Sequence, residues 1–426
     1  MAPATSDPSR SRVVITGIGL ISPIGVTLQD FADRMFAGEW GVRPVTHFDR
    51  ERLVCRRAGE VDNQAFSAHW KPPDHETKRL GRFVHFALSC TRDAVLAACG
   101  NADIAAVLGE RGAVYSGLGM GGLGEVERGV VVQESKGARW TTPYLIPSFI
   151  PSMPASAICR QFGLRCAPYT FAGACAGGAQ AVGEAAAAIA RGDLDWALAG
   201  GTETVITPLG FSGFQAMQAF TLAPEHTPRP FDVGREGMIV GEGAAFFVLE
   251  REDLARARGA RMHGEVRGYA TSFGGESLTT QSHEAAADCL RAALANADLT
   301  PGDVDCVIAQ GNGAVVGDRA EMLALTSVFG ATSPGPSYAS LEGHTGHTFG
   351  ASAPLAMTAA LVAMAHQRVP PTCHFTRTED EFAALDIRGV AHSRTIRVCM
   401  VDSYGFGGVN AALVLSAPSS EPVTSA

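Results

Sequence analysis

One cysteine stands where a reactive side chain is expected. Residues 169–180 read YTFAGACAGGAQ, so an extended apolar stretch runs into small residues with Cys175 among them. An alanine-rich helix is expected to begin there. A thiol at a helix N-terminus faces unpaired backbone N–H groups and the positive end of the helix dipole, and both favour the thiolate. Cys175 is therefore a candidate nucleophile, with an inert buried cysteine as the alternative.

Two later segments could complete a site around this thiol. Residues 340–351 (SLEGHTGHTFGA) place His344 and His347 in a glycine-bracketed turn ahead of another helix rich in small residues. Residues 402–410 (DSYGFGGVN) predict a glycine turn between two strands, which suits a backbone N–H donor to an oxyanion. Taken alone, each segment is equally compatible with an ordinary turn.

The chain is long enough to build rigid elements that position these segments. Its 426 residues are 46% hydrophobic and 18% charged, which is typical of a globular protein with a large core. Buried strands are expected at residues 13–16, 196–199, 244–249, 304–309 and 398–401. Helices are expected at residues 176–191 and 351–366. This alternation predicts an α/β protein with helix-covered sheets.

The two halves of the chain echo each other. Residues 197–205 (ALAGGTETV) suggest a strand and a Gly-Gly turn before a second strand, and residues 398–416 repeat strand, glycine turn and strand. We therefore expect two comparable halves, residues 12–255 and 256–417, stacked into one layered domain. Residues 1–11 and 416–426, rich in Ser, Pro, Thr and Ala, are expected to be frayed tails.

The net charge and the cysteine pattern argue against several classes of partner and site. A net charge of −9 argues against generic nucleic-acid or anionic-membrane binding. No run has the pattern of a signal peptide or the length of a membrane span, so a cytoplasmic protein is predicted. The ten cysteines form no C-x-x-C pair and the histidines are dispersed. Neither a disulfide framework nor a metal site is expected.

Several motifs resemble one family in order and spacing. They are GMGGLGEVE (119–127), the Cys175 segment, AGGTE (199–203), RPFDVGREGMIVGEGAA (229–245), GD-x-x-E (317–321), TGH (345–347) and GFGG (405–408). From residue 13 to 417 the chain resembles the β-ketoacyl-acyl-carrier-protein synthases that elongate fatty acids and polyketides. The resemblance implies a homodimer with the thiolase fold, a five-layered αβαβα sandwich of duplicated halves. It also implies acyl transfer from the phosphopantetheine arm of an acyl carrier protein to Cys175, with no bound cofactor.

The same resemblance assigns further residues. Backbone N–H groups of Cys175 and Phe406 would form the oxyanion hole, and Asp318 and Glu321 would orient the backbone of the site. The acyl pocket would be lined by Met120, Phe214, Phe220, Tyr404 and Phe406. For the second and third of these residues, plain core packing is at least as good an interpretation.

Three basic residues suggest where the carrier protein docks. Lys78, Arg79 and Arg82 lie within about one turn of an expected helix and would form one basic face. In the family such a face meets the acidic carrier protein. A solvated helix surface is the alternative.

The chain departs from the family pattern beside the cysteine. Gln310 stands where an elongating synthase has its first histidine, and Asn312 and Ala314 replace threonines that hydrogen-bond pantetheine. The family lysine before Thr-Gly-His is Glu342 here, and its usual glutamate partner is Ala356. Much of the equipment for elongation is therefore replaced.

The departures predict altered chemistry at four candidate catalytic residues, Cys175, His347, Gln310 and Glu342. Glutamine can donate a hydrogen bond but cannot shuttle a proton. An ionised Glu342 would repel a malonyl carboxylate by on the order of 4 kcal/mol at about 4 Å and an effective dielectric of about 20. We therefore expect a stand-alone enzyme that loads a β-ketoacyl chain on Cys175 and deprotonates it with a carboxylate or His347. The enolate would then close on an internal carbonyl, with lactone release.

This expected chemistry resembles the ketosynthase-like cyclases of the γ-lactam-β-lactone (salinosporamide-type) pathways. Three alternatives stay open. The chain could be an ordinary decarboxylative synthase with tolerated substitutions, or it could transfer the acyl group to an external alcohol or amine. It could also be a non-catalytic partner subunit that sets chain length, although such subunits replace the cysteine that is present here as Cys175.

Overall fold

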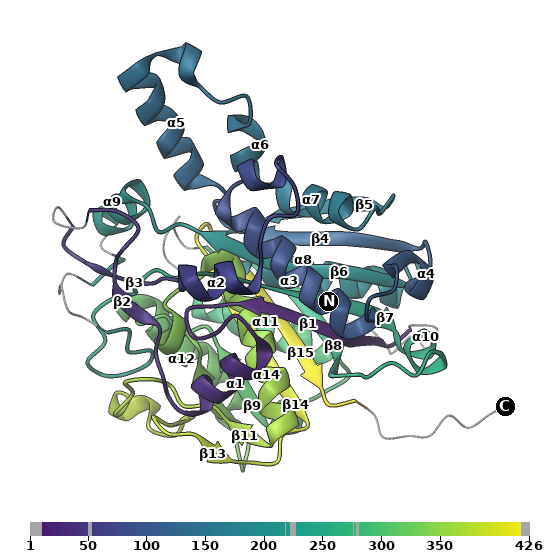
Figure 1. The fold of residues 1–426 in the computed structure, drawn as a ribbon. Coiled ribbons are helices and arrows are strands. Elements are labelled where there is room, and N and C mark those ends of the chain that lie inside the picture. The colour runs from purple at the N-terminus through teal and green to yellow at the C-terminus, as the bar shows by residue number, and fades with distance from the viewer. Residues whose placement is uncertain are drawn as a thin grey trace.

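The N-terminal half of the chain forms five strands of a large sheet (Figure 1). The computed structural model describes residues 11–49, 53–217, 219–221, 227–275, 277 and 281–418, so most of both expected tails lies outside the described residues. The strands are β1 (Val13–Ile21), β4 (Gly112–Leu118), β5 (Ala167–Ala172), β6 (Trp196–Thr204) and β7 (Glu242–Arg251). Their spatial order is β5-β4-β6-β7-β1, with β4 parallel to both neighbours and β7 antiparallel to both of its own.

The C-terminal half repeats this arrangement. Its strands are β8 (Gly264–Phe273), β9 (Cys306–Ala309), β10 (Ser337–Ser340), β14 (Val398–Gly405) and β15 (Val409–Ser416), with β12 (Asp386–Ile387) added at the edge. The order β10-β9-β14-β15-β8 is again third, second, fourth, fifth and first along the chain. A two-residue pairing of β1 with β8 joins the halves. The duplication expected from the sequence is confirmed.

Helices fill the space between the half-sheets and cover their outer faces. The central helices are α8 (Gly177–Ala190) and α14 (Ser352–His366). The outer helices are α3 (Arg82–Cys99) and α7 (Met153–Gln161) on the first half, and α11 (His283–Asn296) and α12 (Val315–Phe329) on the second. Both central helices are apolar on nearly all sides, as expected for helices buried between two sheets. Residues 349–366 are long and apolar enough to span a membrane, but 89% of this segment is buried inside the fold.

Shorter elements complete the described chain. The remaining helices are α1 (Leu28–Phe36), α2 (Asn63–His69), α4 (Ile104–Leu108), α5 (Leu123–Lys136), α6 (Leu145–Phe149), α9 (Pro208–Ala216), α10 (Glu252–Ala257) and α13 (Glu342–Thr345). The remaining strands are β2 (Val42–Pro44), β3 (Arg57–Gly59), β11 (Arg368–Val369) and β13 (His392–Ser393). In Figure 1, α5 and α6 stand out from the body of the molecule. The boundary between the two halves, expected at residue 255, falls within α10.

Glycines let the two halves touch backbone to backbone next to the central helices. A Cβ atom added to Gly201 would lie 2.1 Å from the carbonyl oxygen of Gly350, and one added to Gly178 would lie 2.2 Å from the same atom. The expected Gly-Gly turn was wrong, because Gly200 and Gly201 lie inside β6. Glycine is needed there for close approach of the C-terminal half, not for a change of chain direction.

Replacing Gly201 with Ala should lower the free energy of unfolding by about 1–3 kcal/mol, because the added methyl group overpacks this contact. The measurement is urea-induced unfolding. Gly213→Ala is the control, since a Cβ atom at this helical position meets nothing within 4 Å. Equal unfolding midpoints for Gly201→Ala and the unmodified chain would contradict the account.

Candidate active site

Cys175 lies in a short turn between β5 and α8, as the sequence predicts. It belongs to the 3₁₀ turn Ala174–Ala176, and Ala174 holds a left-handed φ of 51°. Such a backbone conformation is strained for a residue other than glycine and is often found at functional sites. Cys175 is 5% exposed and packs in an apolar cluster that includes Phe214 and Phe349.

His347 reaches Cys175 from the other half of the molecule. Its Nε2 atom lies 3.0 Å from the Cys175 sulfur. The chain arrives through the single-turn helix α13 and then Gly346, whose φ of 68° reverses the backbone direction. The backbone N–H of His347 donates to the carbonyl of Ile239, and its own carbonyl accepts from the N–H of Gly241. The imidazole is thus fixed by its backbone as well as by its ring contacts.

Glu342 completes a line of three side chains. Both of its carboxylate oxygens lie 2.7 Å from His347 Nδ1, while the opposite ring nitrogen contacts Cys175. The Ser352 hydroxyl donates to Glu342 Oε1 at 2.8 Å. The arrangement has the order nucleophile, imidazole and carboxylate that activates cysteine and serine nucleophiles. The sequence analysis placed Glu342 near the site but did not predict its contact with His347.

The groups next to the His347 imidazole favour its protonated form when no substrate is bound. Burial lowers the pKa of His347, but the neighbouring Glu342 and Cys175 outweigh burial and raise this pKa well above its ordinary value. Burial raises the pKa of Glu342, against the opposing effects of the His347 charge and of hydrogen bonds from His347 and Ser352. A histidine that keeps its proton next to a thiol stabilises the thiolate.

Gln310 does not point a free amide at the thiol. Its Oε1 atom accepts from the backbone N–H of Tyr404 at 2.6 Å and lies 3.1 Å from the Ser403 hydroxyl, and its Nε2 atom donates to the Tyr404 carbonyl at 3.2 Å. The Ser403 hydroxyl also lies 3.0 Å from the carbonyl oxygen of Cys175. The geometry therefore gives Gln310 a contact with the end of β14, and its catalytic role stays a prediction.

The glycine turn after β14 approaches the nucleophile closely. A Cβ atom added to Gly405 would lie 3.0 Å from the Gly173 carbonyl oxygen and 3.3 Å from the Cys175 nitrogen. This brings the start of the 405–408 turn beside the backbone N–H of the nucleophile. Phe406 is 38% exposed at that turn. The expected pairing of Cys175 and Phe406 N–H groups as oxyanion donors stays a prediction that this proximity supports.

Aromatic rings gather on the His347 side of the thiol. The rings of Phe214 and Phe349 stack with centroids 4.9 Å apart, and Phe349 lies 4.4 Å from the imidazole of His347. Phe220 is 5.7 Å from Phe214 and belongs to the same cluster as Cys175. These contacts are compatible with Phe214 and Phe220 lining the acyl pocket, which stays a prediction.

Tyr404 does not line that pocket. Its ring packs in the outer core of the C-terminal half, and its hydroxyl donates to Asp402 at 3.0 Å. Residues two apart on a strand share a face, so the two side chains point together, away from the face of Ser403. Burial raises the pKa of the Tyr404 phenol well above its ordinary value. The expectation for the Tyr404 side chain was wrong.

Glu203 is a site residue that the sequence analysis missed. Its carboxylate accepts N–H groups from Gly119, Met120 and Gly121, and from Gly350 at 3.4 Å. Burial raises the pKa of Glu203 to about 7. The acidic end of the AGGTE motif was the available signal. Met120, predicted in the acyl pocket, is 39% exposed with its backbone fixed by this carboxylate.

Asp318 and Glu321 hold the loop that follows β9. Asp318 accepts backbone N–H groups from Phe231, Asn312 and Gly313, and burial raises its pKa to about 6. Glu321 accepts the N–H of Gly311 at 2.9 Å. Burial, and then the neighbouring carboxyl groups, raise the pKa of Glu321 well above its ordinary value. These contacts suit the expected role in orienting the backbone of the site.

The three basic residues do not share one helix face. Lys78 and Arg79 lie in the 3₁₀ turn Thr77–Arg79, and the chain is extended at Leu80 before α3 begins with Arg82. Arg82 forms a two-point ion pair with the buried carboxylate of Glu242. Its Nη2 and Nε atoms lie 2.8 and 2.9 Å from the two carboxylate oxygens. The expected single helix was wrong because Gly81, between the two elements, takes the N-cap position of α3. Lys78 and Arg79 remain exposed.

His344 is an anchor of the turn. Its Nδ1 atom lies 2.7 Å from the Glu39 carbonyl oxygen, and its Nε2 atom lies 2.9 Å from the Pro371 carbonyl oxygen. Burial lowers the pKa of His344. Among the described residues, no group of three or more His, Cys, Asp or Glu side chains is arranged to hold a metal ion.

Comparison with known proteins decides the family. The model of the β-ketoacyl synthase N-terminal domain matches residues 10–255, and the model of its C-terminal domain matches residues 263–376. The chain belongs to the β-ketoacyl synthase family. The 3-oxoacyl-[acyl-carrier-protein] synthase 2 of Synechocystis sp. is 32% identical over 413 residues, covering 95% of this chain and 97% of that protein. The synthase 2 of Staphylococcus aureus is also 32% identical, over 407 residues, covering 95% of this chain and 97% of its own.

Solved β-ketoacyl synthases share the fold. The ishigamide ketosynthase/chain length factor superposes with a TM-score of 0.89 at 30% identity, over 96% of this chain and 100% of that chain. A ketosynthase of a type II polyketide synthase, solved in complex with its acyl-carrier protein and bound to the hexaketide, gives 0.85 at 26% identity with the same coverage. These neighbours confirm the expected thiolase-type α/β fold.

Replacing Glu342 with Gln should slow alkylation of Cys175 near neutral pH by about tenfold or more, since one pKa unit is a factor of ten. The substitution removes a negative charge that raises the pKa of His347, so the imidazole loses its proton at a lower pH than in the unmodified chain. The readout is the rate of iodoacetamide labelling between about pH 6 and pH 9, resolved at the Cys175 peptide by mass spectrometry.

Glu381→Gln removes an exposed carboxylate that pairs with Arg319, and it serves as the control. This variant should label Cys175 at the unmodified rate. Identical pH profiles for Glu342→Gln and the unmodified chain would show that Glu342 does not control the imidazole.

Proposed function

We propose that this β-ketoacyl synthase family member loads a carrier-bound β-ketoacyl thioester on Cys175 and forms a C–C bond without decarboxylation. The bond would form by aldol-type ring closure within the acyl chain, followed by lactone release. The observation that carries the proposal is the line of contacts from Glu342 through His347 to Cys175. It supplies a nucleophile and a base, and it puts a carboxylate where elongating synthases have a lysine.

Loading uses the charged form of the site. The Cys175 thiolate attacks the thioester carbonyl, and the backbone N–H groups of Cys175 and Phe406 stabilise the oxyanion. The carbon–sulfur bond to pantetheine then breaks. The departing thiolate takes the proton from His347 Nε2 and leaves as a thiol. His347 is then neutral, with Nδ1–H donated to Glu342.

The neutral imidazole is now a base. The carbon between the ketone and the thioester is acidic, and His347 Nε2 removes its proton to give an enolate. Glu342 stabilises the resulting imidazolium through Nδ1, as a carboxylate does in other nucleophile–imidazole–carboxylate sites. A base placed near the thiol can reach the acidic carbon of a chain attached to that thiol.

Ring closure restores the starting charges. The enolate carbon attacks an internal carbonyl and leaves an alkoxide. The alkoxide attacks the thioester, a C–O bond forms, and the carbon–sulfur bond to Cys175 breaks. The products are a lactone, a Cys175 thiolate and a protonated His347. The cycle consumes no water and no external proton, which suits a buried site.

Decarboxylation of a malonyl group has less support here. Glu342 is 4% exposed, and the negative charge of its carboxylate would oppose a malonyl carboxylate brought close to it. The Gln310 amide is hydrogen-bonded to the backbone of Tyr404. Position 310 therefore offers no second imidazole to a thioester carbonyl. A neutral β-ketoacyl chain meets neither obstacle.

The partners are also proposals. The acyl chain would arrive on the phosphopantetheine arm of an acyl carrier protein, docked near the exposed Lys78 and Arg79. A second copy of the chain would pair along β5. This strand lies at the edge of the sheet, and its Tyr169 is 46% exposed. Helix α5 has no buried side chain and would also be covered. Exposed edge strands of this kind favour pairing with another chain.

The deciding experiment supplies a carrier-bound β-ketoacyl thioester with an internal ketone, in water labelled with ¹⁸O. Mass spectrometry should find a covalent acyl group on Cys175 and a released lactone without ¹⁸O. Cys175→Ala should abolish loading. Malonyl-carrier protein should yield at least about 100-fold less carbon dioxide than with an elongating synthase, as the charge repulsion predicts.

The double variant Glu342→Lys with Ala356→Glu restores the lysine–glutamate pair of elongating synthases and serves as the comparison. It should lose ring closure and should not slow decarboxylation. Malonyl decarboxylation by the unmodified chain at the rate of an elongating synthase would overturn the proposal. Product formation only when an alcohol or amine is added would replace ring closure with transfer to an external acceptor.

A further inference from the structure

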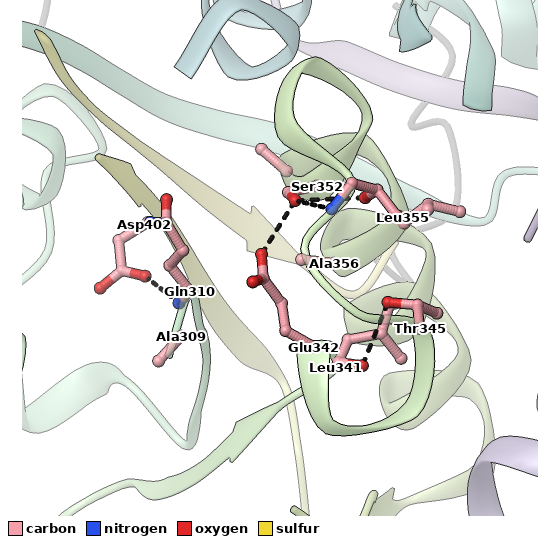
Figure 2. Close-up of a pocket in the computed structure, with 11 residues that line it drawn as sticks. Ala309, Gln310, Leu341, Glu342, Thr345, Ser352, Leu355, Ala356 and Asp402 are labelled. Carbon is pink, nitrogen blue, oxygen red and sulfur yellow. Dashed lines mark hydrogen bonds between the residues drawn. The ribbon is translucent and has the colours of Figure 1, made fainter. Parts of the chain in front are cut away.

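Ser352 touches the carboxylate of the proposed base system. It is the first residue of α14 and is 7% exposed, and its Oγ atom lies 2.8 Å from Glu342 Oε1. Figure 2 shows this hydrogen bond, with Ala356 one turn further along the same helix. Among the described residues, Ser352 and His347 are side-chain donors to Glu342.

The surroundings of Ser352 direct its single proton to Glu342. The backbone N–H of Thr348 donates to Ser352 Oγ at 3.1 Å, and the Thr348 hydroxyl lies 3.1 Å from the same oxygen. A serine hydroxyl has one proton and two lone pairs. His347 Nδ1 also lies 3.3 Å from Ser352 Oγ. With the Thr348 N–H and the protonated His347 ring on its acceptor side, the Ser352 proton is available to the carboxylate. Phe349, with a left-handed φ of 48°, folds the chain so that residues 348 and 352 meet.

A small cavity beside Glu342 leaves its carboxylate with few neighbours. The cavity measures about 10 Å³, and Gln310, Ser352, Ala356 and Asp402 are among the residues that line it. The alanine side chain ends at Cβ and donates no hydrogen bond. A buried carboxylate needs hydrogen bonds to remain ionised. Ser352 therefore supplies a stabilising contact that the residue at position 356 does not.

We propose that Ser352 is a positioning residue that keeps Glu342 ionised and aimed at His347, an inference that rests on the function proposed above. The hydrogen bonds of Ser352 reach Glu342, Thr348 and His347, and His347 in turn contacts the Cys175 thiol. Ser352 acts by fixing which carboxylate oxygen carries the hydroxyl contact, and so how the carboxylate faces Nδ1. Through Glu342, it sets the pH at which Cys175 is reactive.

Other titratable groups face Glu342 or lie close to it. His347 and, beyond it, Cys175 lie on one side, and Asp402 of β14 borders the cavity on the other. Burial raises the pKa of Asp402 to about 6. Glu203 lies near the preceding turn through its contact with Gly350. None of these groups changes when Ser352 is replaced, so a comparison of variants isolates the hydroxyl.

The test is the pH dependence of Cys175 labelling by iodoacetamide in Ser352→Ala and Ser352→Thr. Removing the hydroxyl raises the pKa of Glu342 further, so its charge is lost at higher pH on acidification. A hydrogen bond to a charged group is worth one pKa unit or more. The acidic limb of the labelling profile should therefore move upward by about one pH unit in Ser352→Ala. Threonine keeps the hydroxyl, and its profile should match the unmodified chain.

Thr358→Ala is the matched control, because it removes a buried hydroxyl from α14 that donates only to the Pro354 carbonyl among the described residues. It should lower thermal stability without moving the profile. Ser352→Cys, with a weak donor of similar size, should move the profile as alanine does and replaces Ser352→Ala if that variant does not fold. If folded Ser352→Ala or Ser352→Cys keeps the labelling profile of the unmodified chain while Glu342→Gln shifts it, the role of Ser352 is overturned. The proposed base system would then still stand. An unmoved profile for Glu342→Gln would instead remove the proposed base system.

Discussion

The buried carboxylate of Glu342 is the feature on which the rest of the site depends. An ionised carboxylate inside a protein is costly unless an opposite charge and hydrogen bonds compensate for lost water. Here the compensation comes from His347 and Ser352. In the proposed mechanism the imidazole is the counter-charge of Glu342, so it keeps its proton until Cys175 carries an acyl group. Glu342 thus sets the proton on His347 in the proposed mechanism.

The duplicated fold places these groups together. Cys175 comes from the turn before α8 in the first half, whereas Glu342 and His347 come from the turn before α14 in the second. The glycine contacts between β6 and the turn at Gly350 leave no room for side chains that would separate the halves. Glu203 reinforces the junction by accepting N–H groups from both sides of it. The chemistry therefore depends on backbone packing as much as on the side chains.

Sequence reasoning predicted the fold and the position of Cys175 before a helix, because both leave local signals. Small residues and an alanine-rich run mark the helix after Cys175, and the repeated strand order follows from recurring apolar runs. The contact between Glu342 and His347 left no such signal, since it depends on a one-turn helix and a left-handed glycine between them. The side-chain contacts of Gln310 and Tyr404 were not predicted, for the same reason. Their direction is set by hydrogen bonds along β14, which motif spacing does not reveal.

The protonation state of His347 tests the central claim most directly. Nitrogen-15 NMR of histidine-labelled protein near pH 7 reports whether each ring nitrogen carries a proton. The account predicts protons on both nitrogens of His347 in the free enzyme, and loss of the Nε2 proton once Cys175 is acylated. A neutral ring in the free enzyme, with the proton on Glu342 or on the thiol, would contradict it.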